Sequence, residues 1–279
     1  MACATERFRK GTITMDLGLA GKVAIVAASS GGLGKATALT LAREGALVTI
    51  NGRDAASLAR TAQEIRAETG GDVLEVVADL REEGAADRLV AETLAARGRL
   101  DVVVCNAGGP PPGTFSDLAD KGDAVWLDAI QLNLMSTIRL SRAALPHLET
   151  TGGSITNIVS ISVKQPIPHL VLSNTARTAV VGFAKSLSAE FAPRGVRINN
   201  VLPGSILTNR VRSIAAPKAE ATGRDVEEII REEGAQIPMG RHGTPQEFAN
   251  AVVFLASPAA SYITGVSLLV DGGVFKGLF

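Results

Sequence analysis

Aromatic side chains are scarce in this chain: they make up 4% of its 279 residues, with a single tyrosine and a single tryptophan. A core of this composition must be built from Ala, Val, Leu and Ile, which suits helices packed on a parallel sheet. An excess of charge is also missing, because 28 basic residues balance 28 acidic ones. This balance argues against a general attraction to nucleic acid or to a membrane surface, and we expect neither as a partner.

Cysteines and long apolar runs are few as well. The two cysteines, Cys3 and Cys105, form no disulfide framework, and together with the three histidines they show no metal-ligand spacing. We therefore expect no metal site and a reducing, cytoplasmic location. No apolar run approaches the roughly 20 residues of a membrane-spanning helix. The opening MACATERFRKGTITM has no apolar stretch long enough for a secretory signal.

Short apolar runs alternate with longer helical patterns along most of the chain, and this alternation indicates an α/β protein with a parallel sheet. The strand candidates are KVAIVAA, ALVTIN, DVLEVVA, DVVVCNA, SITNIVS, VRINNVL and VSLLVDG. The helical patterns lie at 33–44, 54–69, 81–97, 123–149, 171–192 and 245–256. We predict a single-domain Rossmann-type, doubly wound parallel sheet of about seven strands flanked by helices.

No linker divides the chain, so we expect one domain over residues 20–279, preceded by a flexible N-terminal extension over 1–19. Residues 205–240 look irregular apart from a charged helix, RDVEEIIREE. Ligands of this fold bind at the carboxyl ends of the strands. A long insertion at 205–240 is therefore expected to form a lid over the ligand.

A glycine-rich turn, AASSGGLGKATA, follows the first predicted strand and opens a helix. Glycines let the backbone approach a pyrophosphate, and the N–H groups at the helix N-terminus can bind it. Any tight turn between a strand and a helix also favours Gly and Ser, so the turn alone is a weak indication of nucleotide binding. The second strand that follows strengthens the indication. The candidate cofactor residues in this turn are Ala28, Ser30, Gly31, Gly32, Leu33 and Gly34.

The second predicted strand ends in NGRD, where NAD-binding proteins usually carry an acidic residue for the ribose hydroxyls. Here Gly52 leaves room and Arg53 supplies a positive charge for a 2′-phosphate, which favours NADP(H). The alternative is that Arg53 is only a solvated loop residue.

These motifs together resemble the short-chain dehydrogenase/reductase family, close to its 3-oxoacyl-carrier-protein reductase-like branch, from about residue 20 to the C-terminus. The family's Thr-Gly-x-x-x-Gly-Ile-Gly corresponds to Ala27, Ala28, Gly32, Leu33 and Gly34, so the first glycine is replaced by Ala28. The resemblance implies a homotetramer. It also implies cofactor contacts from Asp79 and Leu80 at the adenine, from Asn106, Ala107 and Gly108 in CNAG, and from Ile206 and Thr208 after Pro203-Gly204.

The family's catalytic residues are an asparagine, a serine, a tyrosine and a lysine. QLNLMS supplies Asn133 and NIVSIS supplies Ser160, with Ser162 as a second choice by register. Both have structural alternatives: the asparagine can hold helix backbone and a water, and the serine can cap the next segment. The tyrosine position holds Ser173 and the lysine position holds Arg177, which is also expected to contact the cofactor.

This replacement changes the chemistry that the site can perform. A serine hydroxyl is a far weaker acid than a phenol, whose pKa is about 10, and arginine stays charged and donates no proton. The one tyrosine, Tyr262, matches a structural position in SYITG. Ser160, Ser173 and Arg177 can instead stabilise an oxyanion by charge and hydrogen bonds. A water held by Asn133, or His169, is then left to deliver the proton.

Two functions remain open at this point. The first is an NADP(H)-dependent oxidoreductase that moves hydride between nicotinamide and a small-molecule carbonyl or activated alkene. The 2,4-dienoyl-CoA reductases, which share the fold, also carry serine in the tyrosine position, so an acyl thioester is one candidate substrate. The second is a noncatalytic or nonredox NADP-binding sensor or partner subunit. Four basic residues of 205–240 could meet a phosphate of such a substrate or form a solvated face: Arg210, Arg212, Lys218 and Arg224.

Overall fold

The computed structural model describes residues 15–106 and 108–278, so Cys3 and Ala107 lie outside the described residues. Seven strands form one sheet in the order β3-β2-β1-β4-β5-β6-β7, and every neighbouring pair is parallel. This confirms the predicted sheet, and each predicted run matches one strand, although two strands extend one residue past their run, to Gly52 and Pro203. The strands are β1 (Val23–Val26), β2 (Leu47–Gly52), β3 (Val73–Val77), β4 (Val102–Asn106), β5 (Ser154–Ile158), β6 (Arg197–Pro203) and β7 (Ser267–Val270).

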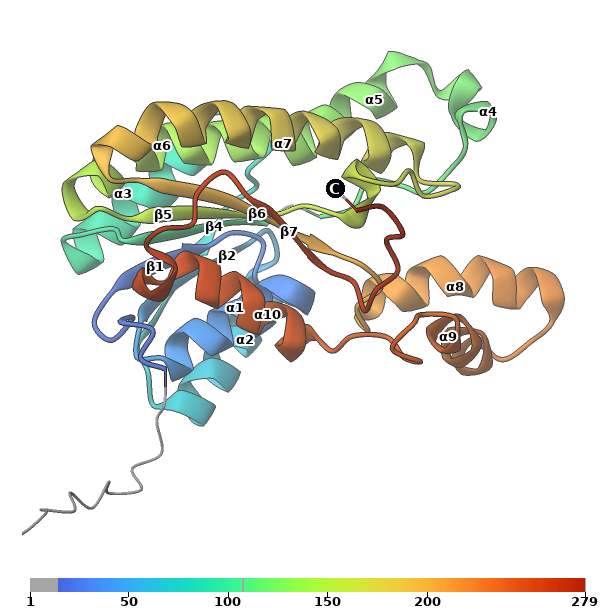
Figure 1. Cartoon of the computed structure of the whole chain (residues 1–279), viewed down its shortest axis with the longest axis horizontal. Coiled ribbons are helices and arrows are strands. Elements are labelled where there is room, and N and C mark those ends of the chain that lie inside the picture. The colour runs from blue at the N-terminus through green and yellow to red at the C-terminus, as the bar shows by residue number, and fades with distance from the viewer. Residues whose placement is uncertain (1–14, 107, 279) are drawn as a thin grey trace, which may run out of the picture.

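Helices cover both faces of the sheet (Figure 1): α3, α6 and α7 lie on one face, and α1, α2 and α10 on the other. The α-helices are α1 (Gly32–Arg43), α2 (Ala55–Thr69), α3 (Ala85–Arg97), α4 (Phe115–Leu118), α5 (Gly122–Ile130), α6 (Ser136–Thr151), α7 (Val171–Phe191), α8 (Asn209–Thr222), α9 (Val226–Ala235) and α10 (Pro245–Ala256). The shorter turns of helix are η1 (Ala119–Lys121), η2 (Gln131–Met135), η3 (Ile161–Val163), η4 (Ala192–Arg194) and η5 (Pro258–Ala260).

The core is aliphatic, as the composition predicts. Successive strand residues face opposite sides of a sheet, and in β1 Ala24 and Val26 pack into one apolar cluster while Val23 and Ile25 pack into the other. Both faces of the central strands are therefore buried under helices. Phe248 is the one aromatic residue among the largest fully buried side chains of the described chain.

The structure departs from the sequence expectation at two helices. The pattern over 123–149 is broken by η2, a π-helical turn that contains Asn133. The helix α8 was not expected, because Pro217 lies inside it and its one fully buried residue is Ala215. This helix is held by packing against α9 through Ala215, Ile229 and Ile230, which no local pattern reveals.

The end of the predicted N-terminal extension belongs to the folded body. Leu19 is 1% exposed and packs in the core beside the partly buried Leu17. Residues 1–14 lie outside the described part of the chain. None of the described helices is both long enough and apolar enough to cross a membrane.

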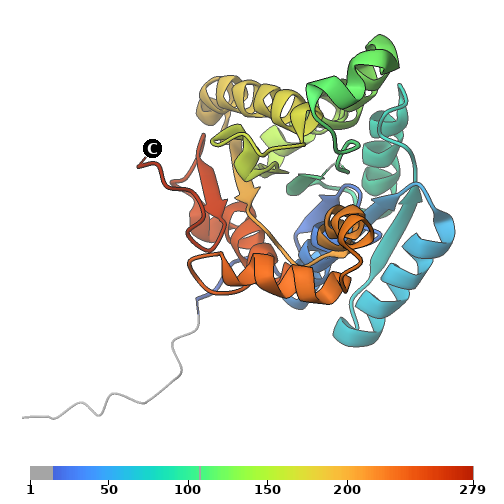
Figure 2. The same ribbon diagram turned by 90° about the vertical axis from the view of Figure 1, so that its right-hand side faces the viewer.

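The connection from β6 to α10 extends beyond the carboxyl ends of the strands. Figure 1 shows α8 and α9 beside these strand ends, and Figure 2 shows the same pair in front of the sheet, with α8 end-on and α9 lengthwise. We call residues 205–240 the α8–α9 segment. Its role as a lid stays a prediction from the sequence.

Candidate active site

A cavity of about 1350 Å³ opens at the carboxyl ends of the strands. Its wall includes Ala28 after β1, Asn106 at the end of β4, Ile158 at the end of β5 and Pro203 at the end of β6, together with residues of α8. Sites for small ligands usually measure about 300–1,000 Å³. This cavity is therefore larger than a site for one small ligand usually is, and it lies at the edge where such folds bind ligands.

The glycine turn fits a bound pyrophosphate. Helix α1 begins at Gly32 behind Gly31, and no side chain caps its first N–H groups. Gly31 lines the cavity, and a Cβ built on it would meet nothing within 4 Å. At Gly34 a Cβ would lie 2.6 Å from the carbonyl oxygen of Ala28 and 2.7 Å from Nδ2 of Asn106, so only glycine lets helix and strand meet there. The backbone thus offers exposed N–H groups next to open space, as anion binding requires.

Ala28 stands where the family has its first glycine, and it adopts a left-handed conformation with φ of +45°. Its N–H donates to Oδ1 of Asn51 at 3.3 Å, and its carbonyl accepts from Nδ2 of Asn106 at 3.0 Å. These two asparagines hold the turn in a conformation that L-residues adopt at a cost of about 1–2 kcal/mol.

Replacing Ala28 by glycine is expected to raise the free energy of unfolding by about 1 kcal/mol, because removing the methyl group relieves the left-handed strain. Urea denaturation measures this change. The matched control is Ala36→Gly inside α1, which is expected to lower stability by about 0.5–1 kcal/mol. A loss of stability in Ala28→Gly would mean that the turn is not strained.

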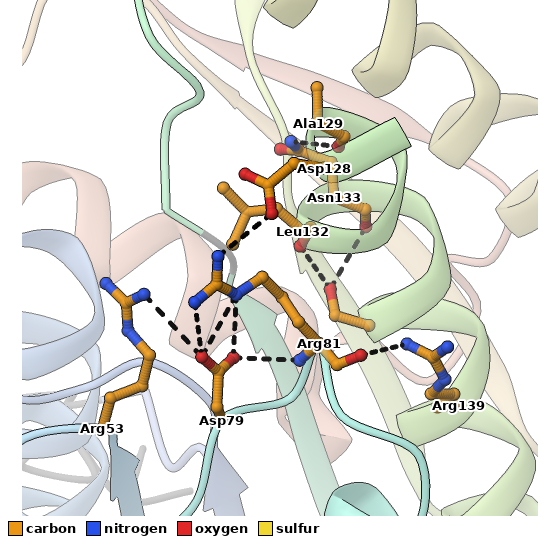
Figure 3. A network of polar contacts seen from close by, with 9 residues as sticks. Arg53, Asp79, Arg81, Asp128, Ala129, Leu132, Asn133 and Arg139 are labelled. Atoms are coloured by element: carbon orange, nitrogen blue, oxygen red, sulfur yellow. Dashed lines mark hydrogen bonds and ion pairs between the residues drawn. The ribbon is translucent and has the colours of Figure 1, made fainter. Parts of the chain in front are cut away.

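Four charged residues meet where the adenine end of the cofactor is expected (Figure 3). The guanidinium of Arg81 bonds Asp79 at 2.7 Å and Asp128 at 3.0 Å, and Arg53 lies 3.8 Å from Asp79. The hydrogen bond from Arg81 is the largest influence that lowers the pKa of Asp79. Leu80 is buried in the core beneath. Sequence reasoning missed Arg81, whose only signal is its place two residues after Asp79.

Three of the four predicted catalytic residues line the cavity: Ser160, Ser173 and Arg177. Ser173 and Arg177 lie one turn apart on α7, and Ser160 follows β5. The hydroxyl of Ser160 accepts from the N–H of Ser162 at 3.1 Å and so also caps η3. Ser162 is buried and is not among the cavity residues, so the geometry favours Ser160 of the two.

The guanidinium of Arg177 reaches across the strand ends. It donates to the carbonyl of Val159 at 2.7 Å, to that of Ile158 at 3.4 Å and to that of Gly108 at 3.3 Å. Burial lowers the pKa of Arg177 to about 10, and the positive charge of Arg210 adds to this effect. Arg177 therefore keeps its charge near neutral pH and presents it at the cavity.

Asn133 lies outside the cavity wall, in the π-helical turn η2 that packs against α7. Its Nδ2 donates to the carbonyl of Ala129 at 2.9 Å, as Figure 3 shows. Its Oδ1 is buried without a hydrogen-bond partner among the described residues. Because a buried acceptor of this kind can bind a water, the arrangement suits both alternatives raised from the sequence. Single π-helical turns occur frequently at functional sites.

The only tyrosine is far from this chemistry. Tyr262 is fully exposed and lines a separate hollow of about 620 Å³ with Lys22, Asp101 and Gly153. These last three precede β1, β4 and β5, so the hollow lies at the opposite end of the strands. His169 lines the cavity at an exposed position. No phenol lines the cavity within the described part of the chain.

A serine–histidine pair in the cavity wall escaped the sequence analysis. Nδ1 of His242 lies 2.8 Å from the hydroxyl of Ser205, and its Nε2 lies 2.7 Å from the carbonyl of Ile230. A carbonyl can only accept, so Nε2 carries a hydrogen and Nδ1 of the neutral ring accepts from Ser205. The pair can therefore pass a proton between the ring and the hydroxyl. Its residues are 37 positions apart, so no local motif joins them.

Comparisons with known proteins agree with this geometry. The family described as enoyl-(acyl carrier protein) reductase matches residues 27–275. The dehydrogenase/reductase SDR family member 4 of Sus scrofa is 34% identical over 261 residues, which cover 93% of this chain and 89% of that protein. L-sorbose reductase of Gluconobacter frateurii, in complex with NADPH and L-sorbose, superposes with a TM-score of 0.89 at 32% identity, covering 95% of this chain and all of that one.

A second solved structure is also similar to this chain. It is an NADPH-bound short-chain oxidoreductase of Pseudomonas aeruginosa PAO1 described as containing an atypical catalytic center, with a TM-score of 0.81 and 33% identity. The match covers 92% of this chain and 97% of that one. With the parallel sheet, the glycine turn and the cavity at the strand ends, these matches establish that the chain belongs to the short-chain dehydrogenase/reductase family of oxidoreductases.

Proposed function

We propose that this protein is an NADP(H)-dependent oxidoreductase that acts on a carbonyl or activated alkene by stabilising an oxyanion with fixed charge instead of using a phenol as acid. The observation that carries the proposal is a single cavity that joins the glycine turn to Ser173 and Arg177 and receives no tyrosine. The NADPH-bound relative with an atypical catalytic center supports it by analogy.

The cofactor is NADP(H). A side chain at Gly52 would bring its Cβ within 3.1 Å of the Cβ of Ser30, a tight contact that disfavours the acidic residue that NAD-binding proteins use. The side chain of Arg53 is 65% exposed and lies 3.8 Å from Asp79, so its guanidinium has donors left for a 2′-phosphate. NADPH is also the nucleotide in the two solved relatives described above.

Arg53→Ala is expected to weaken NADPH binding by about 10-fold to 100-fold, since a hydrogen bond to a charged group contributes about 1.5–3 kcal/mol. NADH binding should stay nearly unchanged. Fluorescence titration with both nucleotides measures the ratio, with Arg43→Ala on α1 as the control, because Arg43 pairs with Glu68 and lies outside the cavity wall. An equal loss of affinity for NADPH and NADH would show that Arg53 does not bind the 2′-phosphate.

Hydride transfer and stabilisation of the oxyanion are assigned to different groups in the cavity. The nicotinamide supplies or accepts the hydride. Arg177 and the hydroxyls of Ser160 and Ser173 hold the substrate oxygen as its bond to carbon gains single-bond character, and their charge and hydrogen bonds are strongest when that oxygen is most negative. Arg177 needs no proton transfer for this role, because it stays charged throughout.

The proton of the product comes from another part of the wall. In the direction of reduction, the oxyanion takes the hydrogen of the Ser205 hydroxyl, and Ser205 regains one from Nδ1 of protonated His242. His242 ends the cycle neutral and is reprotonated from water. The motivating observation is the 2.8 Å contact between Nδ1 and the hydroxyl. The water expected near Asn133 is the competing source.

Single-turnover oxidation of NADPH by ketones, oxo acids, oxoacyl thioesters and enoyl thioesters tests the proposal. Turnover of one class is the expected result, whereas binding of NADPH without turnover of any class would favour a noncatalytic protein. His242→Gln keeps a hydrogen-bonding side chain but carries no proton, so an unchanged rate in that variant would assign the proton to water. The 3-oxoacyl-carrier-protein reductase-like branch, the homotetramer and the cytoplasmic location remain predictions from the sequence.

A further inference from the structure

The α8–α9 segment carries five basic residues, and one of the four that the sequence suggests for phosphate binding differs from the other three. Those three are held in ion pairs between α8 and α9 or close to them. The pairs are Arg212 with Glu227, Lys218 with Glu233, and Arg224 with Glu232. Among the described residues, no carboxylate lies within ion-pair distance of the fourth, Arg210. Three of the four residues are therefore paired with carboxylates, which argues against a phosphate-binding face formed by all four.

Arg210 turns into the cavity and lies over the loop after β4. Its Nη2 donates to the carbonyl of Pro110 at 3.0 Å, and a Cβ on Gly109 would lie 2.9 Å from its Cζ. The guanidinium thus rests on backbone that only a glycine leaves exposed. This hydrogen bond uses one of its five N–H donors.

Arg177 and Arg210 therefore share this cavity, whose wall also includes Lys218 in its pair with Glu233. Burial lowers the pKa of Arg210, and the charge of Arg210 in turn contributes to the lowered pKa of Arg177. The carboxylates of the wall are already engaged: Asp117 accepts from the N–H of Thr114, and Glu233 pairs with Lys218. An anion bound between the arginines would offset their repulsion, and a carboxylate matches the planar fork of a guanidinium.

Apolar side chains line the cavity together with Arg210. Ile214 lies one turn further along the same face of α8 and also lines the cavity, as do Val211 and Val274. We propose that Arg210 binds a carboxylate of the substrate, so that the substrate is an oxo acid, or the matching hydroxy acid, with an apolar body. This rests on the proposed oxidoreductase function and assigns its substrate class.

The test compares Arg210→Met with Arg212→Met, which removes an equal charge from the outer, paired side of the same helix. Arg210→Met is expected to raise KM for an apolar oxo acid by about 10-fold to 100-fold. KM for the methyl ester of that acid and the Kd for NADPH should stay within about twofold of the wild-type values. Gly109→Ala, which displaces the guanidinium but keeps its charge, should shift KM in the same direction. Thermal unfolding checks that each variant is folded.

Three results would overturn the proposal. A weaker Kd for NADPH in Arg210→Met would place Arg210 on a cofactor phosphate, and equal losses for acid and ester would reduce it to a support for the loop at Pro110. Inorganic phosphate competing better than acetate would favour a phosphorylated substrate. Calorimetry of oxo acid binding to the NADPH complex separates this proposal from the proposed function. Binding that depends on Arg210 without any turnover would contradict the oxidoreductase function but would still support a carboxylate site at Arg210.

Discussion

Ser173→Tyr combined with Arg177→Lys is expected to give the protein at least about 100-fold faster reduction of simple ketones by NADPH. General acid catalysis contributes about 10²–10⁴-fold, and the double variant restores a phenol whose pKa a neighbouring lysine lowers. The two positions lie one turn apart on α7 and both line the cavity, so the new side chains can act on one substrate oxygen. Steady-state kcat/KM on a small ketone measures the gain.

The matched control is Ser173→Phe with Arg177→Lys, which brings the same ring without the hydroxyl. This control should show no gain, because only the phenolic proton is proposed to matter. A double variant that loses the native activity and gains nothing on ketones would show that hydride transfer in this cavity is limited by something other than the missing acid.

Arg177→Met is expected to slow the single-turnover oxidation of NADPH by about 10²–10³-fold, the usual effect of removing one group that stabilises an oxyanion. The same change leaves the carbonyls of Val159 and Gly108 without this donor, so thermal stability should also fall. Arg177→Lys keeps the charge but loses the planar fork, and it should retain more of the rate than methionine does. Equal rates in the methionine and lysine variants would remove the role of the charge.

The pH dependence of this variant series follows from the pKa of about 10 at Arg177. Burial disfavours the charged form and lowers this pKa. Because the pKa is still about 10, the charge is fully present near neutral pH and is lost only as the pH rises through about 10. A wild-type rate that depends on Arg177 should therefore fall on the alkaline side.

The fold could be predicted from the sequence because its strands are short apolar runs and its helices have clear periodicity. Val23–Val26 and Val102–Asn106 are nearly all apolar, as burial on both faces requires. The glycine turn was also visible, since Gly31, Gly32 and Gly34 follow a strand directly. Such features depend on neighbours in the chain, and local patterns carry them.

Contacts between distant segments could not be predicted. Helix α8 owes its stability to α9 and carries Pro217, so its own sequence favours no helix. Ser205 meets His242 across 37 positions, and Arg210 meets Pro110 across 100. The left-handed φ of Ala28 depends on Asn51 and Asn106, which lie 23 and 78 positions away. Each of these depends on the packing of elements rather than on a motif.

The claim that fixed charge replaces a phenol in hydride transfer is tested most directly by stopped-flow single turnover of the wild-type protein with NADPH carrying deuterium at the transferred position. The account predicts that NADPH is consumed, that deuterium slows its consumption, and that Arg177→Met slows it further while NADPH still binds. NADPH that binds but is never oxidised by any substrate class, or an oxidation rate indifferent to Arg177, would contradict it.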